Sequence, residues 1–561
     1  MSQFSFFFYR RITTFLTLAI MASGAGMLAL PEPAVTEMAP RRSARVVPRE
    51  YAPVTWRRQD ANAEWVQLGG NPQRTGYVAT ELADRWQFLW VWNGPPPGSD
   101  GGPAASHLKL PQGVQPVFGD GKMYVGHSDG RVRAVRADTG VEVWNTRVGG
   151  EVLNTAAYDA ATGSVFVAST NGRLFRLRAG DGAITGSFNA GASIVMAPLL
   201  VGTTVYIGAT NGRMYAVNTS TLKQRWVYNA GAELRASAAY SSQFGGLIIF
   251  PAEDAFVHAV QATNGRRRWR VAVNTYRDPK RGNRAFNDTF PVVAETNGVV
   301  IIRSYFDWEK TWQPAGGAPA TVAELRSFLA ANPAYQSFHV LNLADGRPRF
   351  VAPVLGGGIG NGGDYYSVPP QVTIRRLPDG GEIAYLFWRT RQSCGEYCDG
   401  REDTTLGEMD LRTGAVRFVE DHKNQGTMRF PTDEQGALSM AGDVLFHAHW
   451  MLMGAIRITD RSPDLGDTYA NPIRSRELTP VLNTIESGAC PQRAADERFC
   501  PNATTPAEGE GFMQDPGFYI YHYDRNVYDQ YFTTPVRSVV IHDGVIYWRS
   551  VDGAIIALRG R

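Results

Sequence analysis

A phrase of about forty residues recurs over residues 114–273 and restricts the fold more than any other property of this sequence. Each copy contains an alternating apolar run, a turn, a second run and a second turn, and the intervals between the first turns are 42, 40 and 43 residues. Glycine in such a turn adopts positive φ without steric cost, so the pattern predicts a two-residue β-hairpin in every copy. A hairpin repeated at this period is typical of the blades of a β-propeller. The first turns are Asp129-Gly130, Asn171-Gly172, Asn211-Gly212 and Asp254-Ala255.

A large ring follows the second turn of most copies at a fixed distance of four residues. Wedge-shaped sheets that pack around an axis must bury an aromatic side chain against the next sheet. These rings are therefore predicted to be structural. They are Trp144, Trp226, Trp269, Phe350 and Phe418, and the second copy departs from the pattern by offering Phe188.

The last copy, at residues 539–558, ends without an aromatic strand, whereas residues 86–92 form an aromatic-rich strand with no sheet of their own. Pairing the two segments would satisfy both exposed strand edges and close a ring. The predicted fold is all-β: a single propeller of eight blades, with seven as the fallback, closed by the N-terminal and C-terminal strands. Insertions extend the copies that correspond to blades 5–7.

The three insertions lie at residues 307–333, 391–405 and 459–533. The first contains Thr321 before an apolar pattern spaced by three and four residues, which predicts a short helix at 321–331. The last ends in residues 511–532, of which eight are Phe or Tyr. Such a segment is either a partner-binding surface or a cap over the ring, and both readings stay open.

The N-terminus differs from the rest of the chain. Arg10 and Arg11 precede an apolar run at residues 12–30, which is the form of an export signal, and small residues at 22–25 offer a cleavage site. The expected organisation is a signal peptide or N-terminal anchor at 1–34, a mobile linker at 35–64 and the propeller at 65–561. The mature protein is expected to be periplasmic, on the cell surface or secreted.

Four cysteines occur, as Cys394-x3-Cys398 and Cys490-x9-Cys500. An even number of cysteines in an exported chain favours disulfides, and neither spacing matches the usual two-residue spacing of zinc ligands. All four are predicted to form disulfides, with three pairings open. The net charge of +3 provides no field for nucleic acid, and contact with a membrane is expected only through the N-terminal segment.

Residues 65–76, Trp-Val-Gln-Leu-Gly-Gly-Asn-Pro-Gln-Arg-Thr-Gly, precede the blades with their Gly-x-x-x-Trp pattern. Together they resemble the quinoprotein-type, pyrroloquinoline-quinone-binding-like propeller repeat, over about residues 65–561. That superfamily includes quinone-dependent alcohol and sugar dehydrogenases. It also includes non-catalytic members such as the propeller subunit of the bacterial outer-membrane assembly machinery, and the repeat does not separate the two classes.

The alcohol dehydrogenases of this superfamily have adjacent, disulfide-bonded cysteines over the quinone and a Glu, an Asn and an Asp around calcium. This sequence has no Cys-Cys pair and no Cys-x-x-Cys-His for an attached haem. No residue is therefore assigned as catalytic or as a metal ligand, and His447 and His449 lack an evident third ligand. No cofactor is assured, and pyrroloquinoline quinone and calcium are expected only if the chain is an enzyme of this superfamily.

Aligning the copies predicts a ligand-binding ring, because equivalent positions in every blade surround one axis. Small residues occupy the ring in blades 1–4, and large or cationic residues occupy it in blades 5–8. Arginines there suit an anionic ligand, although arginines and tryptophans in blade loops also stack or cap carbonyls without any ligand. The candidate binding residues are Arg235, Asp288, Arg303, Trp388, Arg389, Arg429, His447, Trp548 and Arg549.

Three functions stay open. The first is a non-catalytic exported propeller that binds a protein or a small anionic ligand. The second is a divergent quinone- and calcium-dependent dehydrogenase acting on an alcohol or sugar. The third is a hydrolase or lyase built on the insertions, for which the sequence offers neither paired carboxylates nor a nucleophile with its base.

Overall fold

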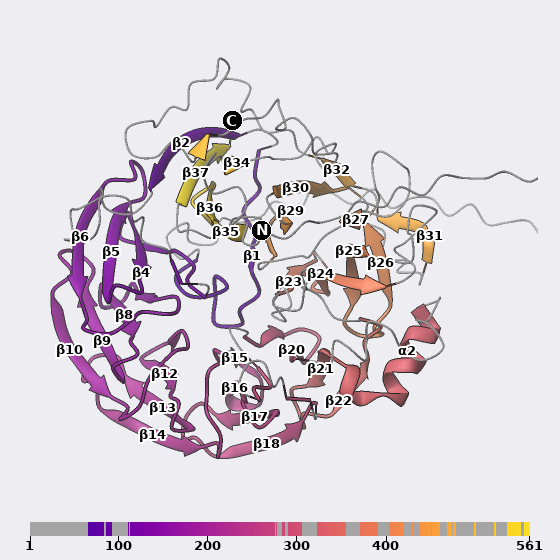
Figure 1. Cartoon of the computed structure of the whole chain (residues 1–561), viewed down its shortest axis with the longest axis horizontal. Coiled ribbons are helices and arrows are strands. Elements are labelled where there is room, and N and C mark those ends of the chain that lie inside the picture. Colours follow the sequence, from indigo (N-terminus) through magenta and orange to yellow (C-terminus); the bar gives the residue numbers. More distant parts are fainter. Residues whose placement is uncertain are drawn as a thin grey trace, which may run out of the picture. The chain divides into compact units, whose positions relative to one another are not determined.

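The computed structural model divides the chain into two units, of which Thr55–Arg561 contains the described residues. Eight sheets of this unit form the blades of a ring (Figure 1), so the predicted all-β class and the eight-bladed propeller are confirmed. The described residues are 65–83, 86–92, 110–111, 113–274, 276–277, 283–286, 290–305, 322–354, 371–377, 379–390, 403–419, 429–430, 438–449, 452–459, 468–473, 475–477, 499–500, 521–522, 536–550 and 555–560.

Blades 1–4 each consist of four antiparallel strands that follow one another in the sequence. Blade 1 contains β3 (Val117–Gly119), β4 (Lys122–Gly126), β5 (Arg131–Arg136) and β6 (Glu142–Arg147). Blade 2 contains β7 (Ala157–Asp159), β8 (Ser164–Ala168), β9 (Arg173–Arg178) and β10 (Ile184–Asn189). Blade 3 contains β11 (Leu199–Val201), β12 (Thr204–Gly208), β13 (Arg213–Asn218) and β14 (Gln224–Asn229). Blade 4 contains β15 (Ala239–Ser241), β16 (Leu247–Ala252), β17 (Phe256–Gln261) and β18 (Arg267–Ala272), with a 3-10 turn η1 (Gln243–Gly245).

Blades 5–7 keep this order and carry additional elements. Blade 5 contains β19 (Val292–Ala294), β20 (Val299–Arg303), β21 (Phe338–Asn342) and β22 (Pro348–Val351), with α2 (Val322–Ala331) and η3 (Pro333–Tyr335) between β20 and β21. Blade 6 contains β23 (Thr373–Arg376), β24 (Glu382–Thr390), β25 (Asp403–Asp410) and β26 (Val416–Val419), joined by β27 (Arg429–Phe430) and β31 (Thr468–Ile473). Blade 7 contains β28 (Ser439–Ala441), β29 (Val444–His449), β30 (Leu452–Ile458) and β32 (Ser475–Glu477), with β1 (Tyr77–Val78) parallel to β28.

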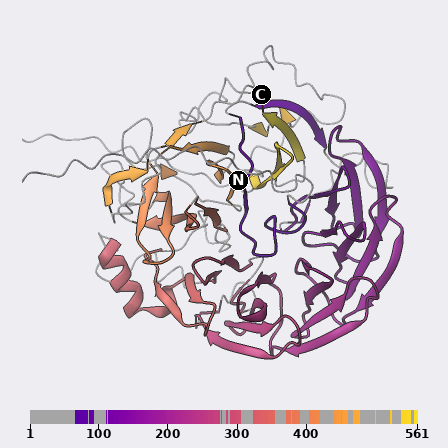
Figure 2. The ribbon, with the colours of Figure 1, turned by 180° about the vertical axis from the view of Figure 1, so that it is seen from behind.

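Blade 8 closes the ring with strands from both ends of the unit. Its strands β35 (Val536–His542), β36 (Val545–Ser550) and β37 (Ile555–Gly560) come from the C-terminus, and its outermost strand β2 (Trp86–Trp92) comes from near the N-terminus. β2 is antiparallel to β37, with Trp86 opposite Gly560 and Trp92 opposite Ile555. The predicted closure is confirmed, and both ring views show the two segments side by side (Figures 1 and 2).

Aromatic rings dock five of the blades on the next. Trp226 of blade 3 donates its indole N–H to the carbonyl of Ala262 at 2.9 Å, and its ring covers Gly265 in the last turn of blade 4. Gly265 has φ +70°, and a Cβ there would lie 2.7 Å from the Trp226 ring. The glycine is thus required both for the turn and for close contact. The same contact joins Trp90 with Gly140, Trp144 with Gly182, Trp269 with Gly346 and Phe350 with Gly414.

Blade 2 makes this contact with the large and small residues exchanged. Register places Gly186 opposite Arg176, where the other blades have the docking ring opposite a small residue, so Phe188 is not the equivalent of Trp144. Leu222 of blade 3 stands where the other turns have glycine, and its side chain fills the space beside Gly186. Arg176 donates to the carbonyl of Thr219 at 2.9 Å and so replaces the indole hydrogen bond.

The first hairpin in each repeat differs from the predicted two-residue turn. In blade 1 Gly130 N donates to His127 O and His127 N donates to Arg131 O, which defines a three-residue loop. Gly130 has φ +76°, whereas Asp129 has no positive φ and instead accepts a hydrogen bond from Arg131 N. This loop needs only one residue with positive φ, which is Gly130, and the Asp129 carboxylate stabilises the turn by its hydrogen bond to Arg131 N.

Residues 65–78 run along the inner side of the ring and contact the innermost strands of blades 1–7. The inner edge of each blade has unpaired N–H groups, and the segment accepts one from nearly every blade through its own carbonyls, such as Trp65 O from Phe118 N at 3.0 Å. Gln67 Oε1 accepts the corresponding N–H of Leu200 in blade 3. The remaining donors are Tyr158 to Val66, Tyr240 to Pro72, Val293 to Gln73, Ile374 to Thr75 and Met440 to Gly76.

Arg74 fixes this segment to blades 3 and 4. Its side chain is fully buried and donates to the carbonyls of Leu68, Pro198 and Ala238 at 2.6–3.3 Å. Burial lowers the pKa of Arg74, and the surrounding oxygens compensate part of the lost hydration of the guanidinium.

The insertions are described in part. The predicted helix is confirmed as α2, and the third insertion contributes β31 to blade 6, parallel to β26. A two-stranded sheet pairs β33 (Phe499–Cys500) with β34 (Tyr521–His522), so the backbone at Cys500 lies beside part of the aromatic segment. Cys394, Cys398, Cys490, the predicted signal at 1–34 and the linker at 35–64 lie outside the described residues. No helix within the described ranges is long and apolar enough to cross a membrane.

Restoring the common docking contact in blade 2 tests the exchange described above. Gly186→Trp alone should lower the free energy of unfolding by about 3 kcal/mol, because the new ring overlaps Leu222. The triple variant Gly186→Trp, Leu222→Gly, Arg176→Ala should return to within about 1 kcal/mol of the wild type. Denaturant unfolding measures both, and a triple variant as unstable as the single one would show that the exchange is not compensatory.

Arg74→Met should destabilise the chain by about 3 kcal/mol or more, because three buried carbonyls lose their donor at once. The matched control is Arg213→Met, which removes an exposed arginine from blade 3. Thermal unfolding should show a clear loss in melting temperature for the first variant and almost none for the second. Equal melting temperatures would refute the anchoring role of Arg74.

Candidate ligand-binding face

The turns between second and third strands, such as residues 127–130, and the segments leading into the innermost strands lie at one end of the blades, since successive strands are antiparallel. We call this end the loop face. The opposite end carries the turns between first and second and between third and fourth strands, and we call it the turn face.

The predicted ring positions are equivalent in space. Each is the second-strand residue that pairs near the beginning of the third strand, so the alignment of the copies is reproduced by the register. The pairs are Gly126 with Val132, Ala168 with Leu174, Gly208 with Met214, Pro251 with Val257, Arg303 with Phe338, Trp388 with Thr405, His447 with Gly454 and Trp548 with Ile556.

Three of the predicted binding residues are packed inside the blades. Arg303 is 1% exposed and its guanidinium lies over the Phe338 ring at 4.8 Å. Trp548 is 3% exposed within the hydrophobic core that joins blades 7, 8 and 1. Arg549 is fully buried and donates to the carbonyls of Leu110 and Pro111 at 2.9 and 2.7 Å. Arg549 thus caps carbonyls, which is the structural alternative that the sequence left open.

The other predicted residues are distributed over several blades. Trp388 in β24 and Arg429 in β27 both pair with Thr405 of β25. The backbones at these two residues therefore lie on either side of the same strand in blade 6. Arg389 pairs with Thr404 in the same sheet, and His447 lies in β29 of blade 7. Asp288 lies outside the described residues.

Arg235 lies near Glu253, a half-buried carboxyl group that sequence reasoning missed. Its Nε donates to Glu233 Oε2 at 2.6 Å. The nearby Glu253 accepts the backbone N–H groups of Ala285 and Phe286 at 2.9 and 3.1 Å. Burial raises the pKa of Glu253 to about 7, although those two hydrogen bonds and the charges of nearby arginines oppose the rise.

A signal for Glu253 was available in the repeat. Its backbone N–H donates to Glu233 O, as those of Thr170 and Thr210 donate to the preceding loop in blades 2 and 3. Blade 4 thus has a carboxylic acid at a position where its neighbours have a hydroxyl group. Such a departure from the repeat identifies a residue with a local role, here holding the loop before blade 5.

A serine and a histidine meet beneath the loop face of blade 5. Ser304 Oγ lies 2.9 Å from His339 Nε2, and burial lowers the pKa of His339 to about 4, so the ring is neutral at pH 7. Asn274 Nδ2 donates to the carbonyls of Tyr305 and Gln336 beside them. Ser304 is 1% exposed, so a substrate could not reach its hydroxyl and the pair serves packing rather than nucleophilic catalysis.

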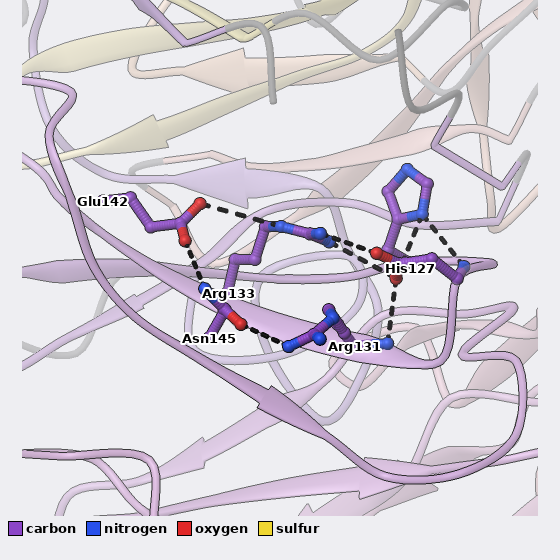
Figure 3. Close-up of polar contacts among 6 residues, drawn as sticks. His127, Arg131, Arg133, Glu142 and Asn145 are labelled. Atoms are coloured by element: carbon purple, nitrogen blue, oxygen red, sulfur yellow. Dashed lines mark hydrogen bonds and ion pairs between the residues drawn. The ribbon is translucent and has the colours of Figure 1, made fainter. Parts of the chain in front are cut away.

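Blade 1 has a polar network on the same face (Figure 3). Asp129 accepts hydrogen bonds from both terminal nitrogens of Arg133. Burial opposes ionisation of Asp129, but hydrogen bonds to His127 and Arg133 prevail and lower its pKa. His127 Nδ1 lies 3.1 Å from the backbone nitrogen of Asp129 and 3.4 Å from its Oδ1. Every labelled charge is directed toward another residue of the blade, which makes this network structural.

The described loop face contains buried cations held by carbonyls, rings or a carboxylate, together with Glu253 and the Ser304–His339 pair. No group of three or more His, Cys, Asp or Glu side chains within the described ranges is arranged to hold a metal ion.

Comparison with known proteins finds a family model that matches part of the chain, and solved structures with a similar fold. Residues 128–307 match the model of the family described as outer membrane protein assembly factor BamB. BamB from Moraxella catarrhalis is 11% identical with a TM-score of 0.46, over 84% of this chain and 99% of that one. Quinohemoprotein alcohol dehydrogenase from Comamonas testosteroni is 12% identical with a TM-score of 0.51, over 88% and 80%. No curated protein matches the sequence. At these identities the structural likeness establishes the fold alone.

Removal of the Glu253 charge should change the pH dependence of stability. The folded protein holds a proton on Glu253 that the unfolded chain releases near pH 4.5, so the free energy of unfolding should fall as pH rises from 4.5 to 7. Relative to Glu253→Gln, the wild type should lose up to about 3 kcal/mol between pH 5 and pH 8. Denaturant unfolding at four pH values measures this, with Glu233→Gln as control. Parallel curves for wild type and Glu253→Gln would contradict the assignment.

Proposed function

We propose that this chain, whose blades have the quinoprotein-type repeat predicted from the sequence, is a non-catalytic exported propeller that binds a protein partner. The observation that carries the proposal is that the protein's own residues occupy the interior of the ring. Residues 65–78 take up the inner N–H groups of blades 1–7, and Arg303, Trp548 and Arg549 are packed within the blades. Recognition is then left to the outer edges and loops of the ring, which suit a macromolecule.

The described residues do not fit the quinone and calcium of the dehydrogenases in this superfamily. Calcium requires six or more oxygen ligands, usually from several carboxylates. Several carboxylates of the loop face are already engaged. One oxygen of Glu253 accepts two N–H groups. Glu233 is paired with Arg235, Asp129 with Arg133 and Asp254 with Arg270. The sequence also lacks adjacent cysteines. No catalytic step is therefore derived through these groups.

The proposed location is outside the cytoplasm, with residues 1–34 as signal peptide or anchor and 35–64 as linker. The family whose model matches residues 128–307 is described as an outer membrane protein assembly factor, and a scaffold in such a process would need a protein partner rather than a substrate. Six of the predicted residues stay proposed for ligand contact on the loop face, while Arg303, Trp548 and Arg549 are packed within the blades. The six are Arg235, Asp288, Trp388, Arg389, Arg429 and His447.

The second candidate is a divergent quinone-dependent dehydrogenase, which is favoured by the likeness of fold to the quinohemoprotein alcohol dehydrogenase. The two functions make opposite predictions for the purified chain. Titration with pyrroloquinoline quinone and calcium should give no saturable heat and no absorbance change, and the mixture should not reduce a dye with alcohols or sugars. An apo-form quinoprotein alcohol dehydrogenase is the positive control. Saturable micromolar binding with dye reduction would replace the binding function by the dehydrogenase.

A further inference from the structure

The turn face of blades 3–5 carries a row of exposed arginines. They lie at the third turn of each blade and in the outermost strand that follows it, around β14, β18 and β22 on the outer edge of the ring (Figure 1). We call this row the arginine arc. Its members are Arg225, Arg266, Arg267, Arg268, Arg347 and Arg349.

The docking contacts between blades make the arc continuous. Arg225 precedes Trp226, whose ring covers Gly265, and Arg266 follows that glycine directly. In the same way Arg268 precedes Trp269, whose ring covers Gly346, the residue before Arg347. Arg268 Nε also donates to Ala344 O of blade 5 at 2.9 Å. Each docking contact therefore places the arginines of one blade beside those of the next.

The positive charge of the arc is almost unmatched. Arg347 lies 3.7 Å from Asp345, and this is the one ion pair of the arc within the described residues. The other carboxylate in these turns, Glu295, accepts hydrogen bonds from Ser241 and Ser242. The corresponding turns of blades 1 and 2 differ, because they pair Lys122 with Asp120, Arg136 with Asp138 and Arg178 with Asp181.

A strained aromatic residue lies beside the arc. Phe244, in the first turn of blade 4, is 42% exposed and has φ +54°, a backbone conformation that costs a bulky residue about 1–2 kcal/mol. The Arg268 guanidinium lies over its ring at 4.0 Å. The turn thus exposes a ring that a glycine would replace without strain. Exposed aromatic and arginine side chains together are the residues most enriched at the centres of protein interfaces.

We propose that the arginine arc and Phe244 bind an acidic, partly apolar segment of a protein partner. This inference rests on the proposed function: it assigns the surface of this chain that binds the protein partner, and the charge of the partner segment. Planar guanidinium groups bind carboxylates in a bidentate manner, and here three successive blades hold them in place. A lipid surface would be attracted equally by lysine and would need more apolar area than one partly exposed ring.

The test uses the full chain and a labelled peptide of three Glu-Glu-Leu units, followed by fluorescence anisotropy. We expect saturable binding that weakens with added salt and falls at least tenfold in Arg266→Glu/Arg267→Glu. Neither side chain makes a hydrogen bond or ion pair within the described residues, so the variant should fold normally. The matched control Arg173→Glu/Arg213→Glu makes the same charge change at the loop face and should alter affinity less than twofold.

A second variant tests the aromatic part of the surface. Phe244→Gly suits the positive φ and should retain the melting temperature while weakening the peptide at least threefold. The inference is overturned if the wild type does not bind the peptide, if both double variants lose binding equally, or if phosphatidylglycerol vesicles bind through the arc and the peptide does not. Quinone binding is measured in a separate experiment. If the arginine arc does not bind the peptide, the proposed non-catalytic function still stands. If the chain turns over substrate with quinone, the non-catalytic function is refuted whatever the peptide result.

Discussion

The pairing of β2 with β37 is the contact on which the rest of the ring depends. Without it blade 8 would have three strands, and both β37 and β2 would expose an unpaired edge. The same N-terminal stretch supplies residues 65–78, which bond to the inner strands of blades 1–7. A stretch of fewer than thirty residues therefore contacts every blade, from inside in seven cases and from outside in the eighth. Contacts so distant in the sequence carry a large cost in loop closure, so the ring is completed only when the whole chain is available.

Docking between blades shows how a repeat tolerates change when volume and hydrogen bonding are conserved. The common form places a Trp indole over a glycine and gives its N–H to a carbonyl. At the junction of blades 2 and 3, Gly186 and Leu222 exchange the large and small residues, while Arg176 provides the missing donor. Three residues distant in sequence thus replace one indole, and the strained left-handed conformation of Leu222 is tolerated because its side chain fills the gap.

The blades, their number and their closure could be predicted because each depends on local patterns that recur. The turn residues repeat at fixed offsets, and the unpaired strand at 86–92 had one evident partner. The exchange in blade 2 was missed because the sequence at Gly186 only shows that the aromatic residue of the pattern is absent. The structure was needed to show that Leu222 of blade 3 packs beside it. Glu253 and Arg74 were missed for another reason: their roles depend on burial and on backbone carbonyls from other blades, which no spacing in the sequence reveals. Arg549 was predicted as a ligand-binding residue, but in the structure it donates hydrogen bonds to the carbonyls of Leu110 and Pro111.

The same packing rule that closes the ring also limits where the protein can act. At five described junctions a glycine of the last turn lies under the neighbouring blade's ring. The residues on both sides of that contact are thereby brought to the outer edge of the turn face. In blades 1 and 2 these flanking positions are uncharged or paired with acids, and they leave little net field. In blades 3–5 they are arginines, and a structural contact repeated three times becomes a row of cations with one strained aromatic residue beside it. Residues 65–78 take up the interior of the ring, so this outer edge carries charge that packing alone does not require.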